Sequence, residues 1–359
     1  MKKLIRILLI LLPILSCSED EKKNGKEFFV FEPDIRLYIS YAFMNAAGFN
    51  HDWNDTMHPI RLEVRNYLDS VLTSDYKKKI NRFYIDMGGG DFYGYGVYAL
   101  NSKNSPHFGL ICDTCKIETI DKFVGYDTLL HDFYNRANIP KLWSKYKEDI
   151  HEMNLQYKPY AEIALKQITN YCRVDSNYYR NIAKGNFYYQ QMPLMSYYTA
   201  FFHETRDDYW VISGPSNGKP GPGGFYHESL HKIINPIVEN NLEVNKRIED
   251  LVPLSQEQLK DNYNSITSIL CESFVRAIDK KLTAQFHQMN NDKLRQMIED
   301  EYRLGHILTF YLFENLPKYE KTNKKLAEYY PELIENIDLE YEKSRWIAYW
   351  KNQKDGLNR

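Results

Sequence analysis

Apolar side chains recur every three or four residues along most of this chain, the spacing that places them on one face of an α-helix. The pattern begins in segment 33–84, where Ile60 and Val64 are one example. It returns in segment 120–172 and continues from residue 225 almost to the end of the chain. The sequence therefore predicts a mainly helical protein.

A different pattern interrupts the helices in the middle of the chain. Segments 187–191, 196–203 and 209–212 are rich in Tyr, Phe and Thr, and the polar residues 205–208 separate the last two. This arrangement is typical of a β-hairpin in a small antiparallel sheet. The run 93–99, which follows three consecutive glycines, favours a strand or an ordered loop. The expected fold class is α+β, mainly α.

The predicted elements divide the chain into two parts near residue 185. We expect a helical N-terminal region over 28–184, followed by a second region over 185–359 that contains the hairpin and the later helices. Segment 213–224 contains so many Gly and Pro residues that it is predicted to be a loop. A helix is expected directly after that loop.

The first residues have the character of a targeting signal. Basic residues at the start precede an apolar stretch, 4–15, that is too short to span a bilayer comfortably. The run 14–17 resembles a bacterial lipobox, which implies that Cys17 is lipidated and begins the mature protein. The alternative is an ordinary signal peptide that is cleaved nearby. We therefore expect a signal peptide at 1–17 and a flexible tether at 18–27.

The expected location follows from this anchor and from the residues after it. The acidic cluster 19–21 resembles the surface-export signal of some Gram-negative lipoproteins. The resemblance implies a protein of the cell envelope that is attached to the outer membrane by lipid and does not span it. A net charge of −2 and a pI near 6.6 argue against DNA or RNA as a partner.

An oxidising envelope would permit disulfides among the remaining cysteines, which are Cys112, Cys115, Cys172 and Cys271. Cys112 and Cys115 form a CxxC, but the second pair that a structural zinc site needs is absent from the sequence. A local disulfide or two half-buried thiols is the expectation. The sequence leaves the pairing open.

The strongest chemical signal is the motif HExxH at residues 227–231. Residues four apart in a helix lie one above the other, so His227 and His231 can bind the same Zn²⁺ ion. Glu228 would then accept a proton from the attacking water and pass it to the leaving amine. Asn235-Pro236 is expected to kink or end this helix. The motif predicts a metal-dependent hydrolase.

A catalytic zinc usually has three protein ligands, so one more is needed. The metzincin pattern is excluded because Ile234 and Ile237 occupy its Gly and third His positions. In gluzincins, which the motif resembles, the third ligand is a Glu from a following helix. This resemblance makes Glu272, on a strongly periodic helix about forty residues downstream, the expected third ligand. A helical wheel places Glu272 opposite the apolar stripe, so a solvated carboxylate is the alternative. The rival ligands are Glu239, Glu243 and Glu249.

The hairpin, the loop, the HExxH helix and the later Glu helix together resemble gluzincin-type zinc metallopeptidases. Segments 225–236 and 272–278 resemble a poorly characterised family of bacterial lipoproteins placed among them, over roughly residues 185–315. The resemblance implies a zincin-like core in which the hairpin 196–212 binds an extended peptide substrate by β-augmentation. Well-known gluzincins have an Asp four residues after the ligand Glu, where this chain has Arg276. Either another carboxylate such as Asp279 has that role, or Glu272 is not the third ligand.

A residue that stabilises the transition state cannot be fixed by spacing. His306, Tyr302 and Tyr311 are the available residues on a later helical segment. His203 and Glu204 are interpreted as a polar pair beside the turn of the hairpin. The leading hypothesis is a zinc peptidase of the bacterial envelope. The alternative is a surface lipoprotein without catalysis, either a pseudopeptidase or a module that binds glycan or peptide.

Overall fold

The computed structural model describes residues 28–50, 56–89, 91–112, 120–205, 207–216, 220–259 and 263–357. The predicted signal peptide, its Cys17 and the tether lie outside the described residues, as does Cys115. In the described part of the chain, no helix is both long and apolar enough to cross a membrane. The expected fold class is confirmed, because helices dominate and the strands form one small sheet.

Six helices of the N-terminal region surround one hydrophobic core. They are α1 (Ile35–Ala47), α2 (Pro59–Val71), α3 (Ser74–Asp86), α4 (Phe92–Leu100), α5 (Tyr126–Arg136) and α6 (Ile139–Leu155). Polar side chains fix the starts of several helices. Asp34 accepts a hydrogen bond from Arg36 N at the start of α1, and Thr73 accepts one from Tyr76 N at the start of α3.

The expectation of a strand or loop over 93–99 is wrong, because this run is helix α4. Asp91 caps the helix by accepting a hydrogen bond from Gly94 N at 2.8 Å. Every residue from Gly94 to Leu100 is buried, so α4 has no polar face to reveal a helical period. The aromatic and β-branched residues that favoured a strand instead fill the N-terminal core.

In the described part of the chain, the sheet has four strands in the order β1-β2-β4-β3. They are β1 (Phe29–Val30), β2 (Phe187–Gln191), β3 (Ala200–Glu204) and β4 (Tyr209–Ser213). Strands β3 and β4 form the predicted antiparallel hairpin, with Phe202 opposite Val211. The expected antiparallel sheet is nevertheless mixed, because β2 pairs in parallel with β1 and with β4. After β2 the chain crosses to the far side of β4, so β3 becomes an edge strand.

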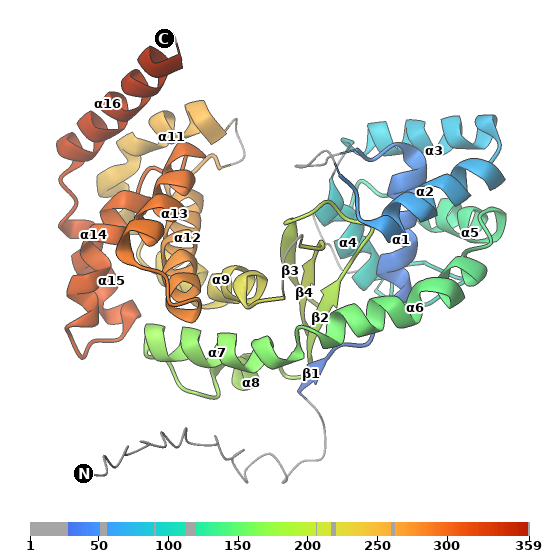
Figure 1. Cartoon of the computed structure of the whole chain (residues 1–359), viewed down its shortest axis with the longest axis horizontal. Coiled ribbons are helices and arrows are strands. Elements are labelled where there is room, and N and C mark those ends of the chain that lie inside the picture. Colours follow the sequence, from blue (N-terminus) through green and yellow to red (C-terminus); the bar gives the residue numbers. More distant parts are fainter. Residues whose placement is uncertain are drawn as a thin grey trace, which may run out of the picture.

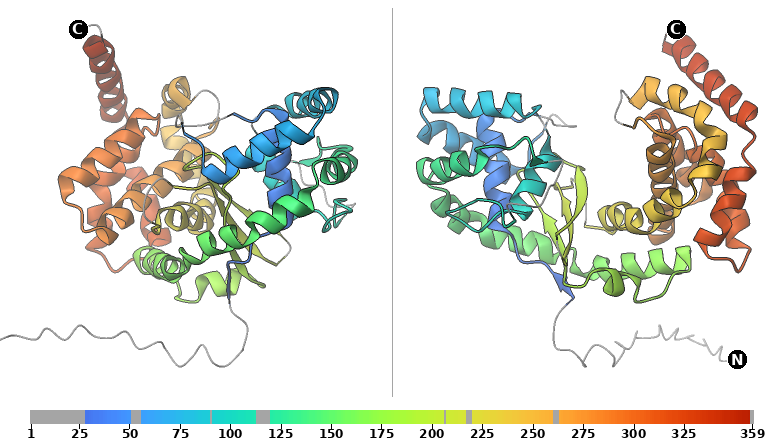
Figure 2. Two further views of the ribbon diagram at one scale, coloured as in Figure 1. Left: turned by 45° about the vertical axis from the view of Figure 1, so that its right-hand side comes forward. Right: turned by 180° about the vertical axis from the view of Figure 1, so that it is seen from behind.

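Each face of the sheet packs against a different lobe. Successive residues of β4 alternate between the two cores: Tyr209 and Val211 lie in one, and Trp210 and Ile212 in the other. Figures 1 and 2 show α1 to α6 on one side of the sheet and the later helices on the other. Residues from both sides of position 185 contribute to each core.

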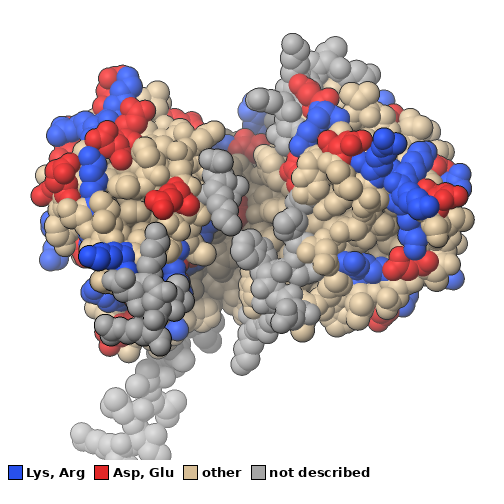
Figure 3. Space-filling view, turned by 90° about the horizontal axis from the view of Figure 1, so that it is seen from above, with Lys and Arg blue, Asp and Glu red and all other residues tan. Residues whose placement is uncertain are grey.

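The second lobe contains the remaining helices. They are α7 (Lys158–Cys172), α8 (Tyr178–Ile182), α9 (Gly223–Glu239), α10 (Leu242–Asn245), the 3₁₀ helix η3 (Lys246–Leu251), α11 (Val252–Leu259), α12 (Ile266–Phe286), α13 (Asn291–Arg303), α14 (Thr309–Glu320), α15 (Leu326–Glu335) and α16 (Leu339–Leu357). Helix α9 packs against α12, α7 and the hairpin. Seen from above, the surface is hollowed between the two lobes (Figure 3).

The cysteines are placed as follows. Cys112 is disulfide-bonded, whereas Cys172 and Cys271 are free and buried. Burial raises the pKa of each of these two thiols to about 12. Both are therefore packed as small apolar side chains, because the reactive thiolate is disfavoured.

Phe225 joins α9 to the sheet, because its fully buried ring stacks on Tyr189 with centroids 4.0 Å apart. We predict that Phe225→Ala lowers the free energy of unfolding by about 3–5 kcal/mol, since it opens a cavity at this contact. Urea denaturation measures the effect. Ile347→Ala, at a side chain that is 58% exposed, should change it by less than about 0.5 kcal/mol. Equal effects of the two changes would contradict this role of Phe225.

Candidate metal centre

Helix α9 holds both histidines of the motif on one face. Their ring centroids are 5.1 Å apart, as expected for residues one helical turn apart. His231 is buried, and the side chain of His227 is 21% exposed. The pair is therefore enclosed by protein but open to solvent on the side of His227.

Three tyrosine hydroxyls hold α9 in place by donating to its main-chain carbonyl oxygens. Tyr209 of β4 donates to Glu228 O at 3.0 Å, and Tyr179 of α8 donates to Ser229 O at 2.8 Å. Tyr178 donates to Lys232 O at 3.0 Å. These bonds fix the turn of α9 that carries the motif.

The bond from Tyr178 also explains why α9 does not end at Pro236. Proline lacks the N–H that would bond to Lys232 O, and the tyrosine hydroxyl takes its place. The helix continues to Glu239, so the expectation that Asn235-Pro236 ends it is wrong. Because Tyr178 donates a hydrogen bond to Lys232 O, this carbonyl has a partner without the expected kink in the helix.

Helix α12 brings Glu272 to the two imidazoles. Glu272 Oε1 lies 3.4 Å from His231 Nε2, and Glu272 Oε2 lies 3.9 Å from His227 Nε2. Ligand atoms about 2.0–2.1 Å from a tetrahedral zinc lie about 3.4 Å apart, so the observed separations suit one shared cation. Among the described residues, these three form the one cluster whose ligand atoms all lie within 4.8 Å of one another.

The Nδ1 atoms of the two histidines face other polar side chains. His231 Nδ1 is hydrogen-bonded to Asn235 Oδ1 at 3.1 Å, and His227 Nδ1 lies 3.9 Å from Asp279 Oδ2. Partners on Nδ1 orient an imidazole so that Nε2 points at the cation. Asp279 thus faces His227 from helix α12, at a distance longer than a direct hydrogen bond.

Glu228 is buried next to this cluster. Burial raises the pKa of its carboxyl to about 8, and the negative charges of Glu272 and Asp279 add to the effect. The main-chain N–H of Phe202 on the edge strand β3 is hydrogen-bonded to Glu228 and opposes the rise. Such a carboxyl exchanges a proton readily near neutral pH.

The histidine next to Glu228 is held neutral. Burial lowers the pKa of His227 well below its usual range, and His231 and Arg276 lower it further. A neutral imidazole is the form that binds a metal. The local electrostatics therefore suit ligation by His227.

The balance of side-chain charges around the cluster favours a divalent cation. Four buried carboxyl groups lie here, those of Glu228, Glu272, Asp279 and Glu301, beside the cations Arg276 and Lys280. Among the described residues, ionisation of all four carboxyl groups leaves two negative charges unbalanced, and protonation of Glu228, which its raised pKa favours at neutral pH, leaves one. Unpaired buried charge is costly, and one divalent ion would neutralise it.

The other sequence candidates lie elsewhere. Glu239, Glu243 and Glu249 are exposed and do not join the cluster. Tyr311 donates a hydrogen bond to Leu333 O at 2.6 Å. Tyr302 packs in the core against Trp346 and Phe310. Tyr302 and Tyr311 are therefore structural side chains that pack away from the cluster.

His306 and Tyr263 lie near the cluster. Their rings are 5.9 Å apart, and burial lowers the pKa of His306 to about 3. Burial raises the pKa of Tyr263 to about 12, the negative charge of Glu272 adds to the rise, and the positive charge of Arg276 opposes it. Sequence reasoning missed Tyr263 because it lies just before α12, in a segment without periodicity or motif.

His203 and Glu204 lie beside the hairpin turn, as expected, and each also has a partner outside the hairpin. Glu204, at the end of β3, forms an ion pair with Lys232 of α9. His203 Nε2 accepts a hydrogen bond from Asn101 Nδ2 of the N-terminal lobe at 2.9 Å. These two residues thus connect the edge strand to both lobes.

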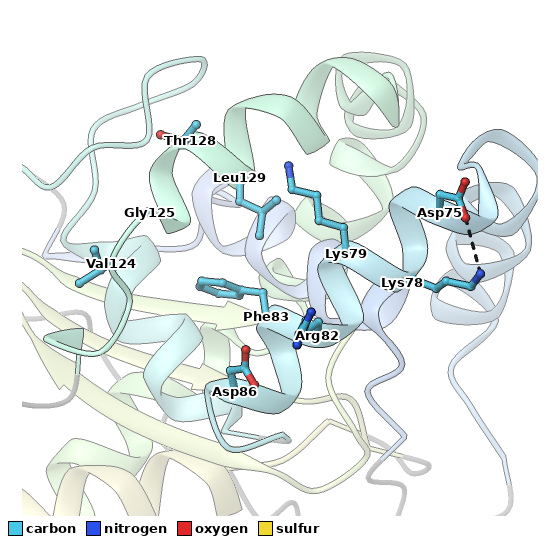
Figure 4. A pocket seen from close by; sticks show the side chains of 10 residues that line it. All are labelled: Asp75, Lys78, Lys79, Arg82, Phe83, Asp86, Val124, Gly125, Thr128 and Leu129. Carbon is cyan, nitrogen blue, oxygen red and sulfur yellow. Dashed lines mark ion pairs between the residues drawn. The ribbon is translucent and has the colours of Figure 1, made fainter.

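The larger of the two described cavities is remote from this cluster. It has a volume of about 660 Å³ and lies between α3 and the start of α5 (Figure 4). Its rim carries Lys78, Lys79 and Arg82 together with Asp75 and Asp86. This mixed lining contains no metal-binding set or nucleophile, so we assign it no chemistry.

Comparison with known proteins covers the segment that forms the cluster. No curated protein and no solved structure matches the chain. The sequence profile of a family described as "Domain of unknown function (DUF4932)" matches residues 223–336. The match begins at the first residue of α9 and includes His227, Glu228, His231 and Glu272. The part of the chain that holds the candidate metal centre is therefore similar to this domain family.

Proposed function

We propose that this protein is a zinc-dependent peptidase of the bacterial cell envelope, attached to the outer membrane through a lipid on Cys17. The observation that carries the proposal is the convergence of His227, His231 and Glu272 with a buried Glu228 beside them. Two imidazoles and one carboxylate are a common protein ligand set of catalytic zinc. The unbalanced negative charge of the site supports a divalent ion.

The residues of this chain divide the chemical work. When bound, Zn²⁺ would polarise the scissile carbonyl and lower the pKa of a water molecule. Glu228 accepts the proton of the attacking water and donates it to the departing amine nitrogen. Tyr263 is the candidate hydrogen-bond donor to the carbonyl oxygen, because it lies close enough to Glu272 for the charge of that ligand to raise its pKa.

The edge strand β3 supports an extended peptide as the substrate. It pairs with β4 on one side only, and the ion pair from Glu204 to Lys232 holds its end against α9. In Figure 1, β3 is the strand nearest the top of the sheet. Figure 3 looks at the molecule from that side and shows the hollow between the lobes. A peptide that adds to this edge would lie beside the HExxH helix.

The first prediction from the proposed function separates metal binding from catalysis. Purified protein should contain about one zinc per chain, and Glu228→Gln should keep the zinc while lowering kcat by about 10²–10⁴-fold, because the proton acceptor is lost. Elemental analysis and a peptide-library cleavage assay measure the two effects. Glu243→Gln, at an exposed position, serves as the matched control. A chain that binds zinc without cleaving any peptide would favour the alternative of a non-catalytic binding lipoprotein.

The second prediction concerns stability. Zn²⁺ at about 100 times its Kd should raise the free energy of unfolding by about 2.7 kcal/mol, because the ion binds the folded chain alone. The gain should persist in Glu228→Gln and disappear in His227→Ala and in His231→Ala. Urea denaturation with and without Zn²⁺ measures it. An undiminished gain in both histidine variants would place the ion elsewhere.

The third prediction tests Tyr263. Tyr263→Phe should lower kcat by about 10²–10³-fold with little change in KM or zinc content, since a donor to the developing oxyanion is removed. Tyr302→Phe and Tyr311→Phe are matched controls in the core and should leave kcat within about twofold. Steady-state kinetics on a cleaved peptide measure all three. A loss of kcat confined to one of the controls would reassign the role.

A further inference from the structure

A cationic side chain contacts the Glu272 carboxylate directly. Arg276 Nε donates to Glu272 Oε2 at 3.0 Å, and Arg276 Nη1 donates to Glu301 Oε2 of α13 at 2.7 Å. The guanidinium therefore bridges the carboxylates of two different helices. Its planar shape fixes both partners at once, which a lysine could not do.

The ionic contacts continue from Glu301 toward His227, the first histidine of the motif. Glu301 Oε1 lies 2.9 Å from Lys280 Nζ, and Lys280 Nζ donates to Asp279 Oδ2 at 3.0 Å. Asp279 Oδ2 is the atom that faces His227 Nδ1. Arg276, Glu301 and Lys280 thus form an uninterrupted ionic chain from Glu272 to Asp279, which we call the α12–α13 network.

The carboxylates of the network are buried, its two cations are about a fifth exposed, and the network is fully charged. Burial alone would raise the pKa of Glu301, but Lys280 and Arg276 lower it below its usual range. Burial opposes the charge of Lys280, yet Asp279 and Glu301 raise its pKa. A buried ionic network adds little stability over apolar packing of the same volume. Its position between two groups of the candidate metal centre points to a role in that centre.

The two oxygens of Glu272 consequently have different surroundings. Oε2 accepts the hydrogen bond from Arg276, while Oε1 is the oxygen closest to an imidazole nitrogen, at 3.4 Å from His231 Nε2. A carboxylate with one oxygen occupied by a guanidinium offers the other oxygen to a cation.

We propose that Arg276, supported by Glu301 and Lys280, is a positioning residue that restricts Glu272 to one ligand oxygen and keeps a coordination position open. This inference rests on the proposed function. At the position where the gluzincin resemblance places an Asp that orients a ligand histidine, this chain has an arginine that contacts the ligand Glu272 itself. The network also ties the orientation of His227 to that of Glu272, through Asp279.

The experiment uses the full chain loaded with Co²⁺ or Zn²⁺. Arg276→Lys keeps the charge and the fold but cannot hold Glu272 and Glu301 together, and Arg276→Met removes the contact entirely. Lys281→Met is the control, because Lys281 lies on the same helix and pairs with Glu320 away from the site. The measurements are the Zn²⁺ Kd by chelator competition, the visible absorption spectrum of the Co²⁺ form, and kcat.

Both Arg276 variants should bind Zn²⁺ about 10–100-fold more weakly, as expected when a group that orients a ligand is lost. Their Co²⁺ bands should weaken, because a freed Glu272 that binds through both oxygens raises the coordination number. Lys281→Met should match the wild type in both respects. A merely structural Arg276 would change stability and leave the Co²⁺ spectrum intact.

The outcomes distinguish this inference from the function on which it rests. A wild-type protein that binds Co²⁺ and cleaves peptides, together with an Arg276→Lys variant of equal affinity and identical spectrum, overturns the positioning role alone. A wild-type protein that binds neither metal overturns the proposed function and the positioning role together. Weaker affinity with an altered spectrum in Arg276→Lys, but not in Lys281→Met, supports both.

Discussion

The contact between α9 and α12 buries three carboxyl groups close together, those of Glu228, Glu272 and Asp279. Like charges in a medium of low dielectric repel strongly, so this arrangement requires nearby cations or a protonated carboxyl group, and the raised pKa of Glu228 reflects this repulsion. Helix α12 supplies part of the compensation itself, through Arg276 and Lys280. The remainder suits a divalent ion between the imidazoles. The demand for charge balance thus links the packing of two helices to the proposed chemistry of the site.

The rest of the fold serves to hold α9 in a fixed orientation. Tyrosine hydroxyls from α8 and β4 bond to consecutive turns of its backbone, and one of them satisfies the carbonyl that Pro236 leaves free. The sheet that supplies Tyr209 is itself packed between two cores. The N-terminal lobe therefore contributes to the site indirectly, because it supports the far face of the hairpin and contacts His203 through Asn101.

Sequence reasoning reached those parts of the site that depend on spacing within one helix. The i and i+4 positions of His227 and His231 follow from the motif alone. The sequence supports Glu272 as the third metal ligand less strongly, because a helical wheel places this residue opposite the apolar stripe. Helix α12 is buried on nearly every side, so the stripe did not mark the face that meets α9. The same cause misled the prediction for α4, whose run of buried aromatic residues has no polar face.

The sequence by itself determined the helical content, the hairpin, and the pairing of two imidazoles with an adjacent acid. These features depend on residues a few positions apart, whose relative geometry is set by the backbone period. Only the tertiary structure decided the parallel pairing of β2 with β4, the approach of Tyr263 and the network that runs through Glu301. Such contacts join segments distant in the chain, and their geometry is fixed by how whole helices pack. No local pattern of residue types carries that information.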